Sequence, residues 1–389
     1  MKLTLLLSGQ GETPAADTVT MWRHDPAARA VWTEAADAVG EPLDRWLDEG
    51  TPADTRRAQL LSAVGSLATY AVVAREIPVA PTFVVGHSVG EVAALGIAHG
   101  LGPAQVARIA EARGRAMLDA VAAGPPTGMR AVVDPPADLV GLVEAAEGVH
   151  VANLNSARQV VISGSLAGLD AFVAATGLRT VPLAVTGAFH TPYMAPAAAA
   201  LRSALDGLEL PPTYGPTVVA NRTALPYDRT DVLAELAAQV VSPVRWAEAV
   251  GYAHDHGSQV MLDLSSTGML ARMSDLPGVT VHRCGTPDGI DAGRRELRHV
   301  IAVEGEYDLA ARALGAIVTT RNLQDDEELY RTTVIPAYQE LRGMAKSAHA
   351  PVERILELVE TVLVAKAVDP ATRERKLADL RWRAARAAA

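Results

Sequence analysis

The sequence has 389 residues, of which 49% are hydrophobic and 21% charged, and its formal net charge is −10. These values exclude a disordered chain and leave room for two or three domains with a sizeable core. The negative balance argues against nucleic acid as a general partner. The single cysteine, Cys284, excludes a disulfide framework and a cysteine-rich metal site, and it fits a reducing cytoplasm.

A short apolar run at residues 3–7 predicts the first buried strand and is far too short for a signal segment or a membrane span. It leads into the loop Gly9-Gln10-Gly11. A dinucleotide fingerprint also begins with Gly-x-Gly after a strand, but here the third glycine is missing and Pro14 follows. The pattern favours a loop with exposed backbone N–H groups. Residues 18–76 are then predicted as helices, with a polar break at 50–52.

The segment 82–91 carries the strongest local motif. An apolar, β-branched run at 82–85 predicts a buried strand, and Gly-His-Ser-Val-Gly at 86–90 follows directly before a helix-forming segment. Strand, sharp turn and helix together predict a nucleophile elbow with Ser88 at its tip. Free N–H groups at the helix N-terminus favour a negative charge developing there. The alternative is a tight glycine turn with an incidental serine.

The next predicted helix, 103–120, carries Arg113 with Ile109 and Met117 about one turn away on either side. This spacing indicates that Arg113 points inward. A lone arginine on a helix is most often a solvated charge. A buried one needs a carboxylate, and close to Ser88 that carboxylate can belong to the substrate.

A glycine- and proline-rich segment at 122–128 is typical of a domain hinge. Behind it a β-α-β-β-α-β order predicts a split βαβ, ferredoxin-like unit inserted between two halves of a larger α/β domain. Its predicted strands are 129–133, 149–152, 159–163 and 180–185, and its helices are 136–146 and 166–176.

His190 lies where the chain returns from this insert, after a glycine turn and an aromatic residue. The cleft between the two lobes is therefore within its reach. His254 and His256 form a His-x-His pair, but no acidic or cysteine ligands accompany them at metal spacing, so we expect surface residues.

The larger domain is predicted to resume with helices at 196–208, 232–240 and up to 255, and with strands at 217–220, 259–264 and 279–283. From residue 308 onward the pattern is helical, at 308–318, 326–344 and 352–368. A basic tail follows, with Arg373, Arg375, Lys376, Arg381, Arg383 and Arg386. Solvated helix-face charges explain it most simply, and a docking surface for an acidic carrier protein is the alternative. We expect domains at 1–124 with 190–306, at 125–189 and at 307–389.

In order and spacing, several separated stretches resemble the malonyl-CoA:acyl-carrier-protein transacylase family, including the acyltransferases of polyketide synthases. They are Gly9-Gln10-Gly11, the elbow at 86–91, Arg113, Asn155-Ser156, Ala188-Phe189-His190, Gln239 and the segment 242–246. The resemblance covers roughly residues 1–300, and the tail resembles, more weakly, those of stand-alone acyltransferases in antibiotic pathways. It implies an α/β fold: a large α/β-hydrolase-like domain with a parallel sheet, the inserted ferredoxin-like small domain and a C-terminal helical extension.

The resemblance also implies catalytic roles. Ser88 would attack a thioester carbonyl, with His190 as general base and later general acid. The backbone carbonyl of Gln239 would orient the imidazole in place of a carboxylate. Backbone N–H groups of Gln10 and Val89 would form the oxyanion hole.

For the substrate, the resemblance implies that Arg113 pairs with the free carboxylate of a malonyl group. His87 and Asn155 would contribute to the same site. Ala-Phe-His resembles the malonyl-selective pattern, in which Phe189 fills the space that an α-methyl group needs. Gly187 departs from this pattern, because the polyketide branch often has histidine there.

The expected activity is malonyl transfer from coenzyme A to the phosphopantetheine thiol of an acyl carrier protein, in polyketide or fatty-acid biosynthesis, without a metal or other cofactor. One alternative is a hydrolase of the same fold, although Arg113 would bring it no benefit. Others are transfer of a different acyl group between carrier proteins and malonyl transfer within a malonate decarboxylase. Ser88 and His190 together disfavour a non-catalytic carrier-binding subunit. We expect a cytoplasmic protein without nucleic-acid or membrane partners.

Overall fold

The computed structural model describes residues 2–387 apart from 51–53, 78, 186, 212–214, 228–230, 275, 304–308 and 346–350. The chain forms two compact units, one of Met1–Val72 with Pro81–Asp291 and one of Val73–Ala80 with Ala292–Ala389. The domain boundaries expected from the sequence stay a prediction.

The elements up to residue 303 include both strands and helices. The strands are β1 (Lys2–Leu7), β2 (Phe83–Gly86), β3 (Thr127–Val133), β4 (Val149–Ser156), β5 (Gln159–Ser165), β6 (Thr180–Pro182), β7 (Thr217–Val218), β8 (Ser258–Asp263) and β9 (Thr280–Arg283). The helices are α1 (Ala16–His24), α2 (Pro26–Val39), α3 (Leu43–Asp48), α4 (Thr55–Glu76), α5 (Gly90–His99), α6 (Pro103–Ala123), α7 (Leu139–Glu144), α8 (Leu166–Thr176), η1 (Pro192–Met194), α9 (Ala195–Ala204), α10 (Val232–Gln239), α11 (Trp246–Asp255), α12 (Met269–Met273) and α13 (Pro287–Val303).

Five strands form a parallel sheet in the order β7-β2-β1-β8-β9. Central β1 pairs with β2 from Thr4 opposite Phe83 to Leu7 opposite Gly86. This register brings the loop after β1 and the turn after β2 to the same edge of the sheet, because the carboxyl ends of parallel strands coincide.

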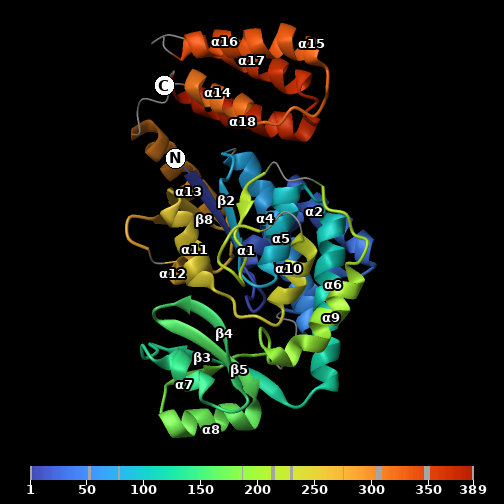
Figure 1. Ribbon diagram of the computed structural model, residues 1–389, viewed down its shortest axis with the longest axis vertical. Coiled ribbons are helices and arrows are strands. Elements are labelled where there is room, and N and C mark those ends of the chain that lie inside the picture. The colour runs from blue at the N-terminus through green and yellow to red at the C-terminus, as the bar shows by residue number, and fades with distance from the viewer. Residues whose placement is uncertain are drawn as a thin grey trace. The chain divides into compact units, whose positions relative to one another are not determined.

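Helices cover both faces of this sheet, as expected where the central strands β1, β2 and β8 each carry an apolar run (Figure 1). On one face, α11 and α12 pack against alternate strand residues such as Leu6, Val85 and Met261, and the fully buried Trp246 is the largest side chain of that cluster. On the other, α5 follows directly from the sheet and is buried along nearly its whole length. The central strands β1, β2 and β8 are therefore almost entirely buried.

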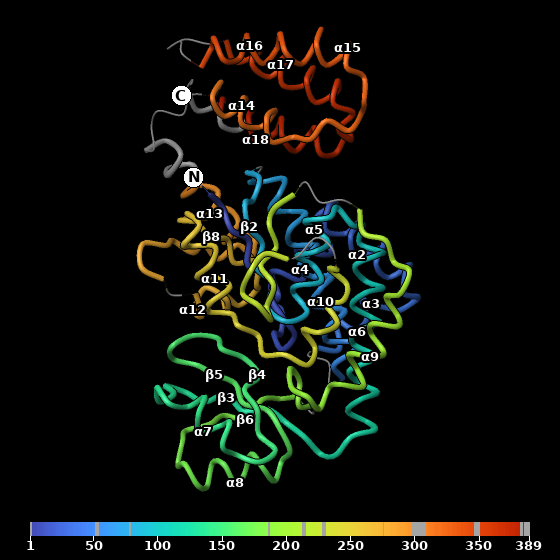
Figure 2. Tube along the Cα trace, viewed as in Figure 1, coloured from blue at the N-terminus to red at the C-terminus, as the bar shows by residue number. Residues whose placement is uncertain are grey.

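The second sheet is antiparallel, in the order β4-β5-β3-β6. Helices α7 and α8 pack on this sheet (Figure 2). Val132 and Ile162 of the sheet and Phe172 of α8 are among the side chains of the core between them. With β3 as its first strand, the order is that of a ferredoxin-like unit. The predicted fold class, a parallel α/β sheet with an inserted ferredoxin-like domain and a helical C-terminal part, is confirmed.

The second unit is helical, with its own core. Its elements are α14 (Leu309–Val318), α15 (Glu327–Leu329), the π-helical turn η2 (Tyr330–Val334), α16 (Ile335–Met344), α17 (Val352–Ala365) and α18 (Pro370–Ala387). Leu341, Val359 and Leu380 are among the side chains that close its core. The buried ammonium of Lys366 donates hydrogen bonds to the carbonyls of Ile317 (2.6 Å) and Thr320 (2.7 Å), which stabilises the end of α14.

The basic tail is helical, as α18. Arg381 pairs with Glu374 at 2.8 Å, Arg375 donates to the hydroxyl of Thr372, and Lys376 is half-buried. The side chains of Arg383 and Arg386 lie outside the described residues. Docking of a carrier protein on this helix stays a prediction.

Two helices, α12 and α13, were not predicted from the sequence. Helix α12 has only five residues, too few to show a helical period. Helix α13 is clearly amphipathic, so its segment did carry a helical signal. In the part of the chain that the structure describes, no helix is long and apolar enough to cross a membrane. Within the same residues, no cluster of three or more histidine, cysteine or acidic side chains could hold a metal ion. His256 is exposed, and its ring stacks on Tyr252.

Candidate active site

The turn between β2 and α5 is a strained elbow. Ser88 has φ of 52°, a left-handed backbone conformation that non-glycine residues rarely adopt. A Cβ on Gly90 would lie 2.5 Å from the carbonyl oxygen of Leu7, and one on Gly86 would overlap the backbone of Gly90. Both glycines are therefore required by close backbone approach, and they hold Ser88 just before the first turn of α5.

His190, Gln239 and Arg113, from distant parts of the chain, all lie close to Ser88. The hydroxyl of Ser88 lies 2.8 Å from Nε2 of His190, and Nδ1 of His190 lies 3.2 Å from the backbone carbonyl oxygen of Gln239. Because that carbonyl can only accept, the proton of the neutral imidazole is on Nδ1, and Nε2 is free to accept the serine proton. His190 also has positive φ, 61°, so both members of the pair are held in strained conformations.

The surroundings of His190 keep its imidazole neutral. Burial, and next the charge of Arg113, lower the pKa of His190 from 6.5 to about 3. Among the residues that the structure describes, no carboxylate hydrogen-bonds to this ring. The imidazole can thus act as a base without a third, acidic member.

Arg113 reaches the same point from α6 and is 1% exposed. Its guanidinium donates to the side-chain oxygens of Gln59 and Gln239, the latter at 2.8 Å, and its Nη2 lies 3.4 Å from Oγ of Ser88. Both acceptors are neutral amides, and in the described part of the chain Nε of Arg113 has no hydrogen-bond partner. Burial lowers the pKa of Arg113 to about 10, so the group is still a cation at neutral pH.

Gln239 joins these groups. Its backbone oxygen contacts His190, its side-chain oxygen accepts from Arg113, and its side-chain nitrogen donates to the carbonyl oxygen of Ser88 at 2.9 Å. A single glutamine therefore contacts Ser88, His190 and Arg113. The sequence identified Gln239 only through its backbone carbonyl.

A buried polar cluster behind the elbow was missed by sequence reasoning. The side chain of Asn221 accepts from the N–H of Ser88 (2.7 Å) and donates to the carbonyl of Gly86 (2.6 Å). The carboxyl group of Glu91, fully buried, accepts from the N–H of Asn221 (2.7 Å) and from the hydroxyl of Tyr227. Burial raises the pKa of Glu91 to about 7. The sequence signal that could have indicated this cluster is Glu91 itself, a charged residue at the start of a largely apolar helix.

The loop after β1 lies beside the elbow. A Cβ on Gly9 would lie 2.8 Å from the carbonyl oxygen of His87, and the hydroxyl of Ser62 holds the carbonyls of Ser8 and Gly9 at 3.1 and 3.0 Å. Among the described residues, the backbone N–H groups of Gln10 and Val89 donate no hydrogen bond. Two free donors thus belong to the segments that border Ser88.

The side chain of Gln10 continues this loop into α4. It accepts from the hydroxyl of Thr55 at 2.6 Å, and Thr55 in turn accepts from Gln59 at 3.1 Å. Gln59 is the acceptor for Arg113. The first two turns of α4 therefore link the loop after β1 to the buried arginine, which the sequence did not indicate.

The small lobe contributes from β4 and β5. Nε2 of His87 lies 2.9 Å from the side-chain oxygen of Asn155, whose amide donates to Gln159 at 2.8 Å. The N–H of Leu154 donates to the carbonyl of Val244 (2.8 Å), which tethers β4 to the segment before α11. His87 and Asn155 thus join the two lobes at the edge of the site.

Phe189 is buried and packs over Gly187. A Cβ on Gly187 would overlap the ring of Phe189 and would lie 2.6 Å from Val121. The missing side chain at 187 is what lets the aromatic ring occupy this place.

One cavity of about 370 Å3 lies at the carboxyl edge of the parallel sheet. Arg113 and Gln239 are not among the residues that line it, although both contact Ser88, which does. Its walls include the loop after β1, the start of α4, Ser88, Phe189 and His190, and from the small lobe Asn155 and Gln159. This volume is within the range of small-molecule sites in proteins, and Ser88 is part of the wall. Chemically the arrangement suits acyl transfer through a serine ester.

A strained serine on a strand–turn–helix elbow, beside a neutral histidine, defines a class of α/β enzymes that form acyl-serine esters. Residues 4–278 match the family described as the acyl transferase domain. A malonyl CoA-acyl carrier protein transacylase of Mycobacterium bovis is 30% identical over 303 residues, which cover 74% of this chain and 98% of the relative. The chain belongs to the malonyl-CoA:acyl-carrier-protein transacylase family, as the sequence indicated.

Solved structures agree on the fold. An acyl-carrier-protein S-malonyltransferase from Bartonella henselae is 29% identical with a TM-score of 0.69, over 76% of this chain and 99% of that one. A malonyl-transacylase solved in complex with its type II polyketide synthase acyl-carrier protein gives a TM-score of 0.70 at 23% identity, over 76% and 100%.

Proposed function

We propose that this protein transfers a malonyl group from coenzyme A to the phosphopantetheine thiol of an acyl carrier protein, through an ester on Ser88. The observation that carries the proposal is the buried guanidinium of Arg113, which is held by neutral amide oxygens and has Nη2 3.4 Å from the hydroxyl of Ser88. A cation held by neutral amides inside the protein favours an anionic ligand, and malonyl thioesters carry a free carboxylate close to the reacting carbonyl.

The reaction follows from the hydrogen bonds. Oγ of Ser88 attacks the thioester carbonyl while Nε2 of His190 takes its proton, and the carbonyl oxygen of Gln239 stabilises the imidazolium that forms. The N–H groups of Gln10 and Val89 donate to the tetrahedral oxyanion. The C–S bond then breaks, and His190 returns the proton to the departing thiolate. The carrier thiol reverses these steps and takes the malonyl group.

Three features support malonyl over other acyl groups and transfer over hydrolysis. Arg113 pairs with the carboxylate, and Phe189 fills the space that an α-methyl group would need. Asn155 closes the site from the small lobe through its hydrogen bond with His87 of the elbow. We assign no metal or redox cofactor to the reaction, since serine and histidine supply the nucleophile and the proton transfer. We place the reaction in the cytoplasm, in polyketide or fatty-acid assembly, with an acyl carrier protein as partner.

Intact-protein mass spectrometry tests this proposal. Incubation with malonyl-CoA should add one malonyl group, and Ser88→Ala should abolish the addition. A phosphopantetheinylated acyl carrier protein should then remove the group and gain it. Equal labelling by malonyl-CoA and acetyl-CoA would overturn the role of Arg113, and loss of the ester to water as fast as to the carrier would favour the hydrolase.

A further inference from the structure

Helices α4 and α6 touch through their backbones at one point. A Cβ on Gly114 would lie 2.7 Å from Cα and 3.1 Å from the carbonyl oxygen of Arg56. Real Cβ atoms do not approach backbone this closely, so only glycine at 114 permits the crossing. The residue before this glycine is Arg113.

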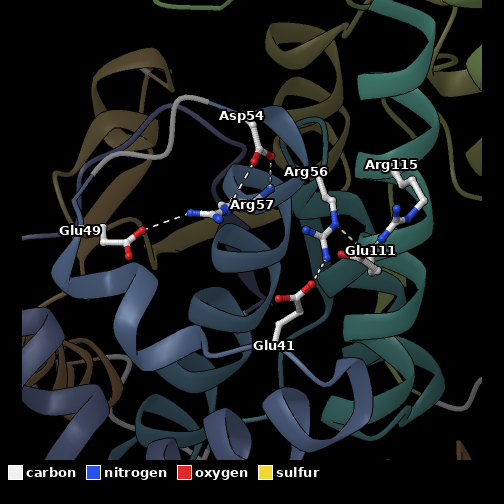
Figure 3. Close-up of polar contacts among 7 residues, drawn as sticks. All are labelled: Glu41, Glu49, Asp54, Arg56, Arg57, Glu111 and Arg115. Atoms are coloured by element: carbon white, nitrogen blue, oxygen red, sulfur yellow. Dashed lines mark hydrogen bonds and ion pairs between the residues drawn. The ribbon is translucent and has the colours of Figure 1, made fainter. Parts of the chain in front are cut away.

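Ion pairs hold the crossing from the solvent side (Figure 3). The guanidinium of Arg56 contacts Glu111 on α6 at 2.6 Å and also pairs with Glu41, which follows α2. The side chains of Arg56 and Glu111 are 14% and 17% exposed, so this pair is less screened than a surface pair. Glu111 also pairs with Arg115 at 2.9 Å, but that arginine is 60% exposed.

On the inner side, the same two helices hold the buried cation. Gln59, one turn after Arg56 on α4, accepts from Nη1 of Arg113 and contacts the sulfur of Met117 on α6 at 3.2 Å. A shift of α4 along or away from α6 therefore moves the acceptor of Arg113. The guanidinium that would lose this acceptor is the one whose Nη2 lies 3.4 Å from Oγ of Ser88.

We propose that the Arg56–Gly114 crossing is a positioning device, and that Arg56 and Gly114 set the selectivity of the site for acyl groups with a free carboxylate. Neither residue touches the reacting atoms. They fix the separation of α4 and α6, which fixes where the guanidinium of Arg113 lies relative to the hydroxyl of Ser88. This inference rests on the proposed function, because it assumes that Arg113 receives the carboxylate.

The decisive variant is Gly114→Ala, with Gly251→Ala as matched control. Gly251 lies inside α11, and a Cβ there would meet nothing within 4 Å. Two rates are measured for each protein: malonylation of Ser88 by malonyl-CoA, and sulfonylation of Ser88 by phenylmethanesulfonyl fluoride, which needs the nucleophile but no carboxylate. We expect Gly114→Ala to slow malonylation about tenfold or more, because misplacement by an ångström can cost a hundredfold. Sulfonylation should stay within about twofold, and Gly251→Ala should change neither rate.

Arg56 provides the second test, for the case that Gly114→Ala does not fold. Arg56→Met should lower the ratio of malonylation to sulfonylation, Arg56→Lys should restore part of it by keeping one ion pair, and Arg115→Met should leave it unchanged. A wild-type ratio in folded Gly114→Ala or Arg56→Met overturns the positioning role alone. If the unmutated protein is sulfonylated but not malonylated, the proposed function itself is overturned.

Discussion

Replacing Arg113 by methionine distinguishes the effect of this buried charge on folding stability from its effect on malonyl loading. In the unliganded protein the guanidinium is 1% exposed and held by two amide oxygens, so removing it relieves the desolvation of a buried cation. The same change leaves the oxygens of Gln59 and Gln239 without their donor, at roughly 1–3 kcal/mol each. These effects oppose each other, and methionine fills a similar volume. We therefore expect Arg113→Met to fold with a melting temperature close to that of the wild type.

The effect on malonyl loading should be large. A carboxylate bound by two charge-assisted hydrogen bonds gains about 1.5–3 kcal/mol from each, hence about 3–6 kcal/mol in all. Since about 1.4 kcal/mol corresponds to a factor of ten, kcat/KM for malonylation of Ser88 should fall roughly 10²- to 10⁴-fold. Loading from acetyl-CoA should not fall, because an uncharged acyl group does not use the cation.

Single-turnover acylation, followed by intact mass with malonyl-CoA and acetyl-CoA in parallel, measures both rates on the same preparation. Sulfonylation of Ser88 confirms that the nucleophile is intact. Malonylation within about threefold of the wild type in a folded Arg113→Met protein would refute the reasoning, because so small a change corresponds to under 1 kcal/mol. The carboxylate would then bind elsewhere.

Three further outcomes follow from the same geometry. Because the pKa of His190 is lowered to about 3, kcat/KM for malonylation should stay level from pH 8 to about 5, and an acid limb near pH 6.5 would contradict a neutral, buried base. Folding raises the pKa of Glu91 from 4.5 to about 7, so the protonated carboxyl group favours the folded state. The free energy of unfolding should therefore fall by on the order of 3 kcal/mol as the pH rises from about 4.5 to 7. Urea denaturation of Glu91→Gln should not show this fall. Phe189→Ala should improve methylmalonyl over malonyl loading by about ten- to a hundredfold in a competition assay, and an unchanged ratio would remove Phe189 from the selectivity argument.

Local patterns in the sequence were sufficient to predict the elbow, the inserted small domain and the inward direction of Arg113. The apolar run before Gly86 and the helix-forming run after Gly90 predicted the elbow, because close backbone approach at both glycines leaves few other conformations. The order of strands and helices between residues 127 and 182 predicted the ferredoxin-like insert in the same way. Arg113 was placed inward from its apolar neighbours one turn away, and it is buried.

Only the tertiary structure decided which polar groups surround the elbow. Asn221 and Glu91 lie 130 residues apart in sequence, yet one hydrogen bond joins them beneath Ser88. Periodicity reports which face of a helix is buried, but it carries no information on which distant polar group that face meets. For this reason nothing in the sequence indicated that Gln59 accepts a hydrogen bond from Arg113.

The sequence by itself determined that a serine would be held at a strained turn, since steric exclusion between near neighbours acts over a few residues. Tertiary structure alone decided that the acceptor of Arg113 comes from α4 and that Gly114 sets the spacing of the two helices. Long-range contacts of this kind depend on how whole elements pack, because close packing fixes distances between side chains that no local rule relates.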